Sequence, residues 1–353
     1  MLAETVDAVI GIDTHRDTHE VEIADPVGRP IVTMRIGNDS AGFTRLLAAI
    51  AEVVPGPRVA VCMEGSRSYG IGLARTLAAA GLLVLECEQP SRKQRRGTGK
   101  SDPVDAHLAV LAALRLDATR LPVPRADGDR EALRILLVAR QEITEASTAQ
   151  AGRLRALLLA GEDSDRWAAR GTLTQAALKA LAGRELHADA SREQAVRHAE
   201  IRRLALALIQ ARHQLRDNRA QLLAITDDIA PGLTSRYGIG PVSAAQTIVS
   251  FSHPGRCRSE AAFAALAGTS PLPASSGQTI RHRLNRGGDR ALNRAIHAIA
   301  VVRMRSCPRT RAYVARRTAE GKTTREIRRC LKRYIARELY RHLTHSMNPP
   351  VSP

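Results

Sequence analysis

Two aspartates three residues apart could together hold a metal ion. Asp102 and Asp105 stand at a spacing that a helix places on one face. Ser101 is suited to cap the start of that helix, and Pro103 fits its first turn, where a missing N–H costs nothing. Two carboxylates on one face repel each other unless a cation neutralises them or water separates them. The spacing therefore predicts half of a divalent metal site.

Two further acids each end an apolar stretch rich in β-branched residues. Asp13 closes residues 7–13, and Glu64 follows residues 58–63. A strand often ends in an acid because the chain emerges into water, but strand ends in α/β sheets also gather ligands and catalytic groups. Taken with the aspartate pair, the four carboxylates are better explained as a site for Mg²⁺ or Mn²⁺, since these cations prefer hard oxygen ligands.

The elements that must position these acids follow the order β-β-β-α-β-α-β-α. Three strands in succession predict a meander, and the later strands alternate with helices, which favours a mixed sheet with helices on both faces. The polar–apolar alternation of the second strand indicates a half-exposed strand. We expect an α/β domain over residues 1–120, with strands near 7–13, 20–25, 31–36, 58–63 and 82–85 and helices near 40–53, 70–80 and from 102.

The composition indicates a polyanionic partner. The 353 residues include 53 Lys and Arg against 35 Asp and Glu, a formal net charge of +18, which favours nucleic acid over an anionic membrane. No apolar run approaches the roughly 18 residues of a membrane-spanning helix. Because aromatic residues make up only 3% of the chain, phosphate contact by Arg is expected rather than stacking on single-stranded bases.

Cysteine usage bears on redox state and on zinc. The five cysteines are scattered and form no C-x-x-C pair. This pattern predicts reduced thiols in a cytoplasm, without a zinc site or a disulfide framework.

A basic loop precedes the helix of Asp102. Residues 91–100 carry two glycines and five basic side chains: Arg92, Lys93, Arg95, Arg96 and Lys100. A solvated surface loop is one interpretation, and a clamp for backbone phosphates beside the metal site is the other.

At this point a family resemblance emerges. Ile10-Gly11-Ile12-Asp13-Thr14, Glu64 after its strand, and Ser101-Asp102-x-x-Asp105-Ala106 resemble the DEDD transposases of bacterial insertion sequences, in insertion-sequence family one-hundred-and-ten. The resemblance implies a RuvC-like, RNase H-type fold for the first domain, with Asp13, Glu64, Asp102 and Asp105 as the four acids. Gly65-Ser66-Arg67-Ser68-Tyr69 departs from the family's usual Ala-Thr-Gly-x-Tyr, although Tyr69 keeps its place.

Residues 121–225 are expected to form a helical connector. Apolar residues recur at helical spacing over 129–159 and 191–225, which indicates either an antiparallel coiled-coil arm or simple bundle packing. The resemblance favours the arm, used to form a homo-oligomer, either a dimer or a tetramer. The single tryptophan, Trp167, is expected to be a packing residue in the turn region.

A mainly helical second domain is expected over 226–345, followed by a tail at 346–353. Its Gly238-Ile239-Gly240 stretch resembles a helix-hairpin-helix, in which backbone N–H groups of a tight turn meet DNA phosphates. An ordinary tight connection between helices is the alternative.

The loop 268–279 contains Ser-Gly, which by itself usually forms a turn. The resemblance gives it a role, because these transposases carry their catalytic serine at this distance after an Ala-Gly-x-x-Pro segment. The Gly268…Pro271…Gly277 pattern aligns that serine with Ser276, and Ser275 is the alternative one residue away. Attack by Ser276 would leave DNA covalently attached and conserve the bond for rejoining.

The chain downstream is heavily basic. Residues 281–341 contain nineteen Lys and Arg but four acids, and a charge excess of this size favours neutralisation by a polyanion. The arginines that follow the serine most closely are expected to bind phosphates: Arg281, Arg283, Arg286, Arg290 and Arg294.

Together these features predict a DNA transposase that cleaves and rejoins strands with a divalent metal. The resemblance further implies donor and target double-stranded DNA, a structured guide RNA from the element, and a cytoplasmic, nucleoid-associated protein. A hydrolytic RuvC-like junction resolvase or nuclease, using only the four carboxylates, is the first alternative. A non-enzymatic nucleic-acid-binding protein is the second.

Overall fold

The chain folds into two compact units. The structure, a computed structural model, describes residues 1–87, 102–118, 121–125, 127–273, 282–283, 285 and 287–347. The first unit comprises Met1–Glu131 with Phe251–Phe263, and the second comprises Ala132–Ser250 with Ala264–Pro353. The predicted boundaries near residues 120 and 225 remain predictions.

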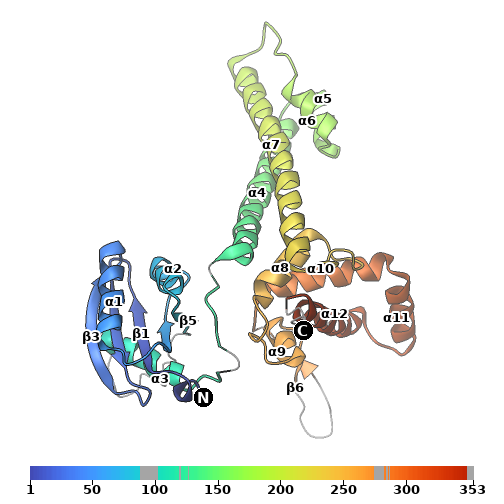
Figure 1. Cartoon of the computed structure of the whole chain (residues 1–353). Helices are drawn as coiled ribbons and strands as arrows, with labels where there is room; N and C mark the ends of the chain where they lie inside the picture. Colours follow the sequence, from blue (N-terminus) through green and yellow to red (C-terminus); the bar gives the residue numbers. More distant parts are fainter. Residues whose placement is uncertain are drawn as a thin grey trace. The chain divides into compact units, whose positions relative to one another are not determined.

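A five-stranded mixed sheet forms the centre of the first unit (Figure 1). After a short 3₁₀ turn at Leu2–Glu4, the strands β1, β2 and β3 form an antiparallel meander, and β4 and β5 run parallel to β1 in the order β3-β2-β1-β4-β5. This confirms the predicted order of elements and the mixed sheet. The strands are β1 (Ala8–Thr14), β2 (Thr18–Ala24), β3 (Pro30–Gly37), β4 (Val59–Met63) and β5 (Leu83–Glu86).

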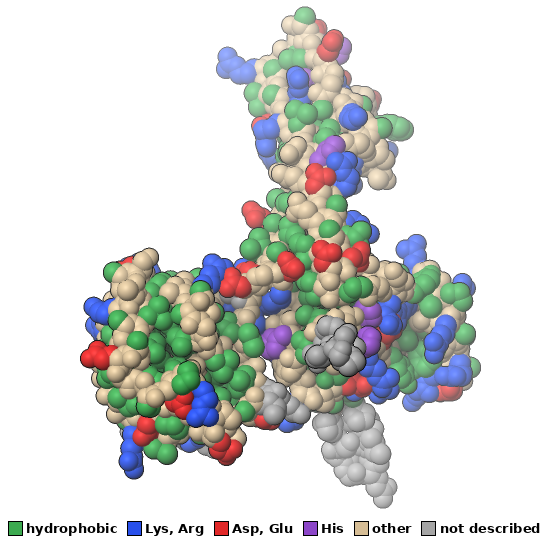
Figure 2. All heavy atoms as spheres, in the orientation of Figure 1, with side chains coloured by type: hydrophobic (Ala, Val, Ile, Leu, Met, Phe, Trp, Pro, Cys, Tyr) green, Lys and Arg blue, Asp and Glu red, His purple; other side chains and the backbone are tan. Residues whose placement is uncertain are grey.

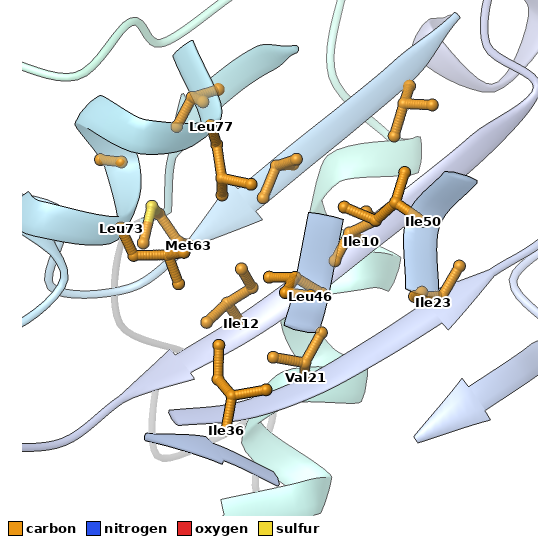
Figure 3. Close-up of a cluster of buried hydrophobic side chains, with 14 residues drawn as sticks. Ile10, Ile12, Val21, Ile23, Ile36, Leu46, Ile50, Met63, Leu73 and Leu77 are labelled. Atoms are coloured by element: carbon orange, nitrogen blue, oxygen red, sulfur yellow. The ribbon is translucent and has the colours of Figure 1, made fainter. Parts of the chain in front are cut away.

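Helices cover both faces of this sheet, as the sequence predicts. The helices α1 (Ser40–Val53) and α2 (Ile71–Ala79) pack on one face, where Leu46 and Leu73 join the strand residues Ile10 and Ile12 in a buried cluster (Figure 3). On the opposite face, α3 (Asp102–Leu114) packs through Val110 onto strand residues that include Val9 and Ala60. The side-chain period of two along each strand supplies both apolar layers.

Two cysteines of the first unit form a disulfide, so the prediction of five reduced thiols is wrong for this pair. Cys62 lies on β4 and Cys87 follows β5, with their Cα atoms 5.9 Å apart. The strands β4 and β5 are neighbours in the sheet, and this pairing joins cysteines 25 residues apart that share no short motif. Cys257, Cys307 and Cys330 are free, as predicted.

Two long helices dominate the connector, close to where the sequence predicts them. In the antiparallel pair α4 (Gly128–Leu159) and α7 (Arg192–Ile229), Asn218 Nδ2 donates to the Leu136 carbonyl at 2.9 Å, and Arg197 Nη1 donates to the Ala160 carbonyl at 2.9 Å. Figure 1 shows the two helices side by side. A coiled-coil supercoil remains a prediction.

The helices α5 (Asp163–Arg170) and α6 (Gln175–Ala182) connect the long pair. They join it in a buried cluster that includes Leu158, Leu178 and Leu204. Trp167 lies on α5 with 78% of its surface exposed, so the expectation of a packing residue in a turn is wrong. The apolar side of this short helix is supplied instead by Ala169 and its neighbours.

The chain after the connector is mainly helical, as predicted. A small antiparallel pair of strands interrupts the helices, and a buried apolar layer of α10 and α12 includes Ile296, Ile299 and Leu339. No helix in the described part of the chain is long and apolar enough to span a bilayer. The elements are α8 (Pro241–Phe251), α9 (Glu260–Leu266), β6 (Leu272–Pro273), β7 (His282–Arg283), α10 (Arg290–Ser306), α11 (Pro308–Ala319) and α12 (Thr324–Ser346).

Candidate active site

Two of the predicted acids are fixed at one end of neighbouring strands. Asp13 lies near the end of β1 and is only 8% exposed, while Glu64 follows β4 directly. The Glu64 N–H donates to the Ile12 carbonyl at 3.1 Å, and Thr14 Oγ1 donates to the Glu64 carbonyl at 2.8 Å. These two bonds hold the Glu64 backbone to β1 on either side of Asp13. His15 Nε2 lies 3.3 Å from Asp13 Oδ2.

The helix α3, which carries Asp105, packs on the same face of the sheet as Asp13. Asp13 is two residues beyond Gly11, so both face the same side of β1. A Cβ at Gly11 would lie 2.1 Å from the Ala106 carbonyl oxygen, so only glycine admits the α3 backbone this closely. Asp105, next to Ala106, is half-buried. Asp102 begins α3, and its side chain lies outside the described residues.

Two more buried acids lie on this face and were missed at the sequence level. Glu20 pairs across the sheet with Asp13, and Glu22 pairs with Gly11. Both are buried, so β2 is not the half-exposed strand that its alternation predicts. Arg35 Nε donates to Glu20, and His107 Nδ1 lies 2.6 Å from Glu22 Oε1. Glu20 and Glu22 stand two positions apart on β2, so their side chains share one face of the sheet. Since a helix must cover that face, this spacing was the sequence feature that indicated two buried acids.

The donor chemistry of this edge suits a hard divalent cation. Asp13, Glu64 and Asp105 offer carboxylate oxygens, which Mg²⁺ and Mn²⁺ prefer. Among the side chains that the structure describes, no three from His, Cys, Asp and Glu are grouped closely enough to hold a metal ion. Asp102, the fourth predicted ligand, is outside that set.

The turn that departs from the family pattern pairs with the end of β5. Arg67 Nε lies 2.8 Å from Glu86 Oε1, and Arg125 Nη2 lies 2.5 Å from the same oxygen. Burial alone would raise the pKa of the Glu86 carboxyl, but the hydrogen bond and charge of Arg125 and the charge of Arg67 outweigh it and lower that pKa. Tyr69, whose place is kept, is 53% exposed.

The residues that flank the segment with the predicted nucleophile, on its two sides, contact each other. The strands β6 and β7 pair Leu272 with Arg283, and the Asp289 N–H donates to the Leu266 carbonyl at 2.7 Å. These contacts close the two ends of the segment that contains the serines. Ser276, and the alternative Ser275, lie outside the described residues.

Comparisons with known proteins agree with this arrangement. Residues 10–160 match a family model of IS110-type DEDD proteins described as transposase, and residues 230–315 match the model described as transposase of the IS116/IS110/IS902 family. The chain belongs to the IS110 family of DEDD transposases. It is a transposase by family, and the family implies DNA as its substrate and a divalent metal as its cofactor.

Relatives extend over most of the chain. An insertion element IS110 protein of 43.6 kDa from Streptomyces coelicolor is 26% identical over 91% of this chain and 90% of its own. An insertion element IS900 protein of 42 kDa from Mycobacterium paratuberculosis is 25% identical over 88% of this chain and 89% of its own. A putative transposase of the IS117 mini-circle from S. coelicolor is 28% identical over 45% of this chain and 39% of its own.

The structure describes only part of the transposase's predicted nucleic-acid contacts. Arg290 and Arg294 are exposed on α10. Arg283 is described only in its backbone, as part of β7. The other predicted phosphate ligands lie outside the described residues, namely Arg92, Lys93, Arg95, Arg96, Lys100, Arg281 and Arg286.

The predicted glycine turn connects α7 to α8. Gly238 has a φ of 76°, a left-handed conformation that favours glycine, and a Cβ there would approach the Ile299 carbonyl oxygen of α10 at 3.4 Å. Arg303 Nε donates to the Tyr237 carbonyl at 2.8 Å. A structural reason for the glycine is therefore present, and phosphate contact at Gly238 and Gly240 remains a prediction.

Proposed function

We propose that this transposase cleaves and rejoins DNA through a covalent serine–DNA intermediate, with its chemistry divided between the two units. The observation that supports the proposal is that Asp13 and Glu64 lie at the ends of two neighbouring strands of the first sheet. Two hydrogen bonds hold the Glu64 backbone to β1 on either side of the buried Asp13, and α3, which carries Asp105, packs on the same face of the sheet. Such pre-positioned carboxylates are what phosphoryl transfer requires of a protein.

The four carboxylates, Asp13, Glu64, Asp102 and Asp105, would hold the metal. A bound Mg²⁺ or Mn²⁺ would supply positive charge to the phosphate oxygens of the reacting strand. The protein's own part is to hold these acids in register. The Arg35 guanidinium beside Glu20 compensates part of the mutual repulsion of the acids, and His15 and His107 lie within contact distance of Asp13 and Glu22.

Ser276 would supply the oxygen that attacks. Its hydroxyl gives up its proton, the oxygen bonds to phosphorus, and the bond from phosphorus to one sugar oxygen breaks. That sugar leaves as a hydroxyl after taking up a proton. The reverse attack by a sugar hydroxyl rejoins the strand and frees the serine. Because both units contribute, the acids and the serine come from one protomer or from two partners of a homo-oligomer.

Self-association is assigned to the helical arm. Its helices expose apolar side chains, including Val138 on α4, Leu206 on α7 and Trp167 on α5, that packing within the arm leaves uncovered. Light scattering of the full chain would report a dimer or tetramer, and Trp167→Glu with Val138→Glu should shift it towards monomer. Unchanged mass would contradict the assignment.

Sequence choice is assigned to an RNA that pairs with donor and target DNA. An Arg-rich surface with 3% aromatic residues suits backbone contact, with the sequence left to base pairing. A structured RNA from the element should copurify with the protein and be required for strand exchange at matched sites. Full activity after RNase treatment would contradict this part of the proposal.

The test of the chemistry separates a serine recombinase from a hydrolytic nuclease. Duplex DNA carrying the element ends is incubated with wild type, Ser276→Ala, Ser275→Ala and Asp13→Asn in the presence of Mg²⁺. Ser276→Ala and Asp13→Asn should both abolish cleavage, whereas Ser275→Ala should keep it. Continued cutting by Ser276→Ala would identify a hydrolytic nuclease, and loss only with Ser275→Ala would move the nucleophile by one residue.

A further inference from the structure

Three basic side chains gather where α10 packs on α12. They are His297 on α10 and Arg328 and Lys332 on α12, and we refer to them as the basic trio. Positions 328 and 332 are one helical turn apart, so their side chains share a face of α12. Lys332 Nζ donates to Asn293 Oδ1, and Asn293 lies one helical turn from His297 on α10, so the three basic side chains lie near one another.

The trio has no acidic partner among the described residues. Its members take part in none of the ion pairs between described side chains, and Arg328 Nε is buried without a hydrogen-bond partner in that part of the chain. A buried donor without a partner is costly unless something outside the chain satisfies it.

The four acids of this segment are all engaged elsewhere. Asp289 caps α10 and accepts from Ser250 Oγ at 2.6 Å. Glu326 caps α12 together with Thr323. The remaining two pair with arginines outside the trio, namely Glu320 with Arg317 and Glu338 with Arg303 and Arg236. The positive charge of the trio is therefore not neutralised from within this basic segment.

The lack of a counter-charge is accompanied by lowered pKa values in the trio. Burial and then the charge of Arg328 lower the pKa of the Lys332 ammonium. Burial and then Lys332 and Arg328 lower the pKa of the His297 ring. Like charges held together without a counter-charge destabilise the folded protein, and such groups cluster at functional sites.

Hydrogen bonds connect the trio to the residue before the segment that contains Ser276. Lys332 Nζ donates to Asn293 Oδ1 at 2.6 Å, and Asn293 Nδ2 donates to the Ala267 carbonyl at 2.6 Å. Ala267 directly precedes Gly268, where the Ser276 segment starts, and the returning end closes on Leu266. Any strand held by the trio therefore lies close to the base of that segment.

We propose that the basic trio binds a backbone phosphate of the DNA strand that Ser276 attacks, an inference that rests on the function proposed for Ser276. Arg328 offers a planar fork of N–H donors, and Lys332 and His297 add further donors. Phosphate contacts position a strand without reading its sequence. The trio would thus hold the strand in place while base choice is made elsewhere. Figure 2 shows Lys and Arg side chains gathered over the C-terminal helices.

The test is equilibrium binding of the full chain to a short duplex DNA over a range of salt concentrations. Arg328→Gln with Lys332→Gln should weaken binding about tenfold or more at low salt and reduce the slope of log affinity against log salt by about 1 to 2. The matched control is Arg325→Gln with Arg329→Gln, two exposed arginines of the same helix. An equal loss in the control would overturn the inference.

Two further measurements separate binding from folding and DNA from RNA. Without nucleic acid, the melting temperature of the trio variant should equal or exceed that of wild type, because repulsion is relieved. A clear drop would indicate a structural role and overturn the inference. A loss confined to a single-stranded RNA of the same length would overturn the assignment to DNA. Ser276→Ala should keep trio-dependent binding, so failure of the serine chemistry is distinguishable from failure of this site.

Discussion

The acidic edge of the first sheet and the basic trio of the last helices treat their charge in opposite ways. Around Asp13, the buried acids Glu20 and Glu22 each have a polar partner from the same unit, the Arg35 guanidinium and the His107 ring. The trio of His297, Arg328 and Lys332 has no acid among the described residues. The first region is therefore organised before any ligand arrives, whereas the second is complete only when an anion binds. This difference is what we expect of a catalytic metal edge and a DNA-holding surface.

Removing an acid from the edge should have the largest effect. Glu64→Gln keeps the two hydrogen bonds of the residue 64 backbone to β1 but loses a negative oxygen. Strand cleavage should therefore fall at least about a thousandfold. DNA binding should stay within about twofold, because nucleic-acid contact is assigned to basic residues. Glu52→Gln, an exposed glutamate of α1, is the matched control. Equal cleavage by Glu64→Gln and wild type would remove this residue from the site.

The close approach of α3 should be the next most sensitive feature. Gly11→Ala would place a Cβ 2.1 Å from the Ala106 carbonyl oxygen, so we expect a local loss of about 3 kcal/mol. Hydrogen exchange should accelerate in peptides of β1 and α3 and stay unchanged in α4. In the other unit, a Cβ at Gly152 on α4 would meet no neighbouring group within 4 Å, so Gly152→Ala should stabilise that helix by about 0.5–1 kcal/mol. Normal exchange in Gly11→Ala would contradict the packing.

The hydrogen bond between His107 on α3 and Glu22 on β2 should contribute less. His107→Ala leaves the Glu22 carboxylate buried without its partner, at a cost of about 2 kcal/mol, and α3 should exchange faster. His107→Gln keeps a donor and should restore most of the protection. If both variants behave like wild type, the pair does not hold α3 in place.

Acid sensitivity of the second unit should be the smallest effect. Burial raises the pKa of the Glu338 carboxyl, but Arg303 and Arg236 outweigh it and lower that pKa below its ordinary value of 4.5. Stability from this carboxylate is therefore present above about pH 4.5 and lost as the pH falls through the lowered value. Glu338→Gln should flatten the fall of melting temperature below that pH by an amount equivalent to about 1 kcal/mol. Glu142→Gln, an exposed glutamate on α4, should not.

Much of the fold was predictable because its signals are local. Apolar periods placed the five strands and the long helices, and strand ends indicated Asp13 and Glu64. Contacts between residues on different strands could not be predicted in this way, because they depend on parts of the chain that are distant in sequence. The Cys62–Cys87 disulfide joins neighbouring strands, and the burial of Glu20 and Glu22 depends on α3 covering their face. Tryptophan is usually largely buried, but Trp167 lies on a short helix of the arm and its side chain is exposed.

The candidate site divides in the same way. The acid pair at 102 and 105 followed from helical spacing, and α3 begins at Asp102. The basic trio has no signature in the sequence, because α10 and α12 bring together residues some thirty positions apart and every arginine in a basic segment looks alike. Its distinguishing feature is that Arg328 and Lys332 are half-buried without an acidic partner among the described residues, which only the packing of the helices reveals.

The central claim is that acids of the first unit and a serine of the second act on one phosphate. The most direct measurement is mass spectrometry of the protein recovered with DNA ends after reaction in Mg²⁺, followed by nuclease and protease digestion. A nucleotide remnant on the peptide at Ser276, absent when Asp13→Asn replaces wild type, is the result we predict. Cleaved DNA with no attached peptide, or a remnant on another residue, would contradict the claim.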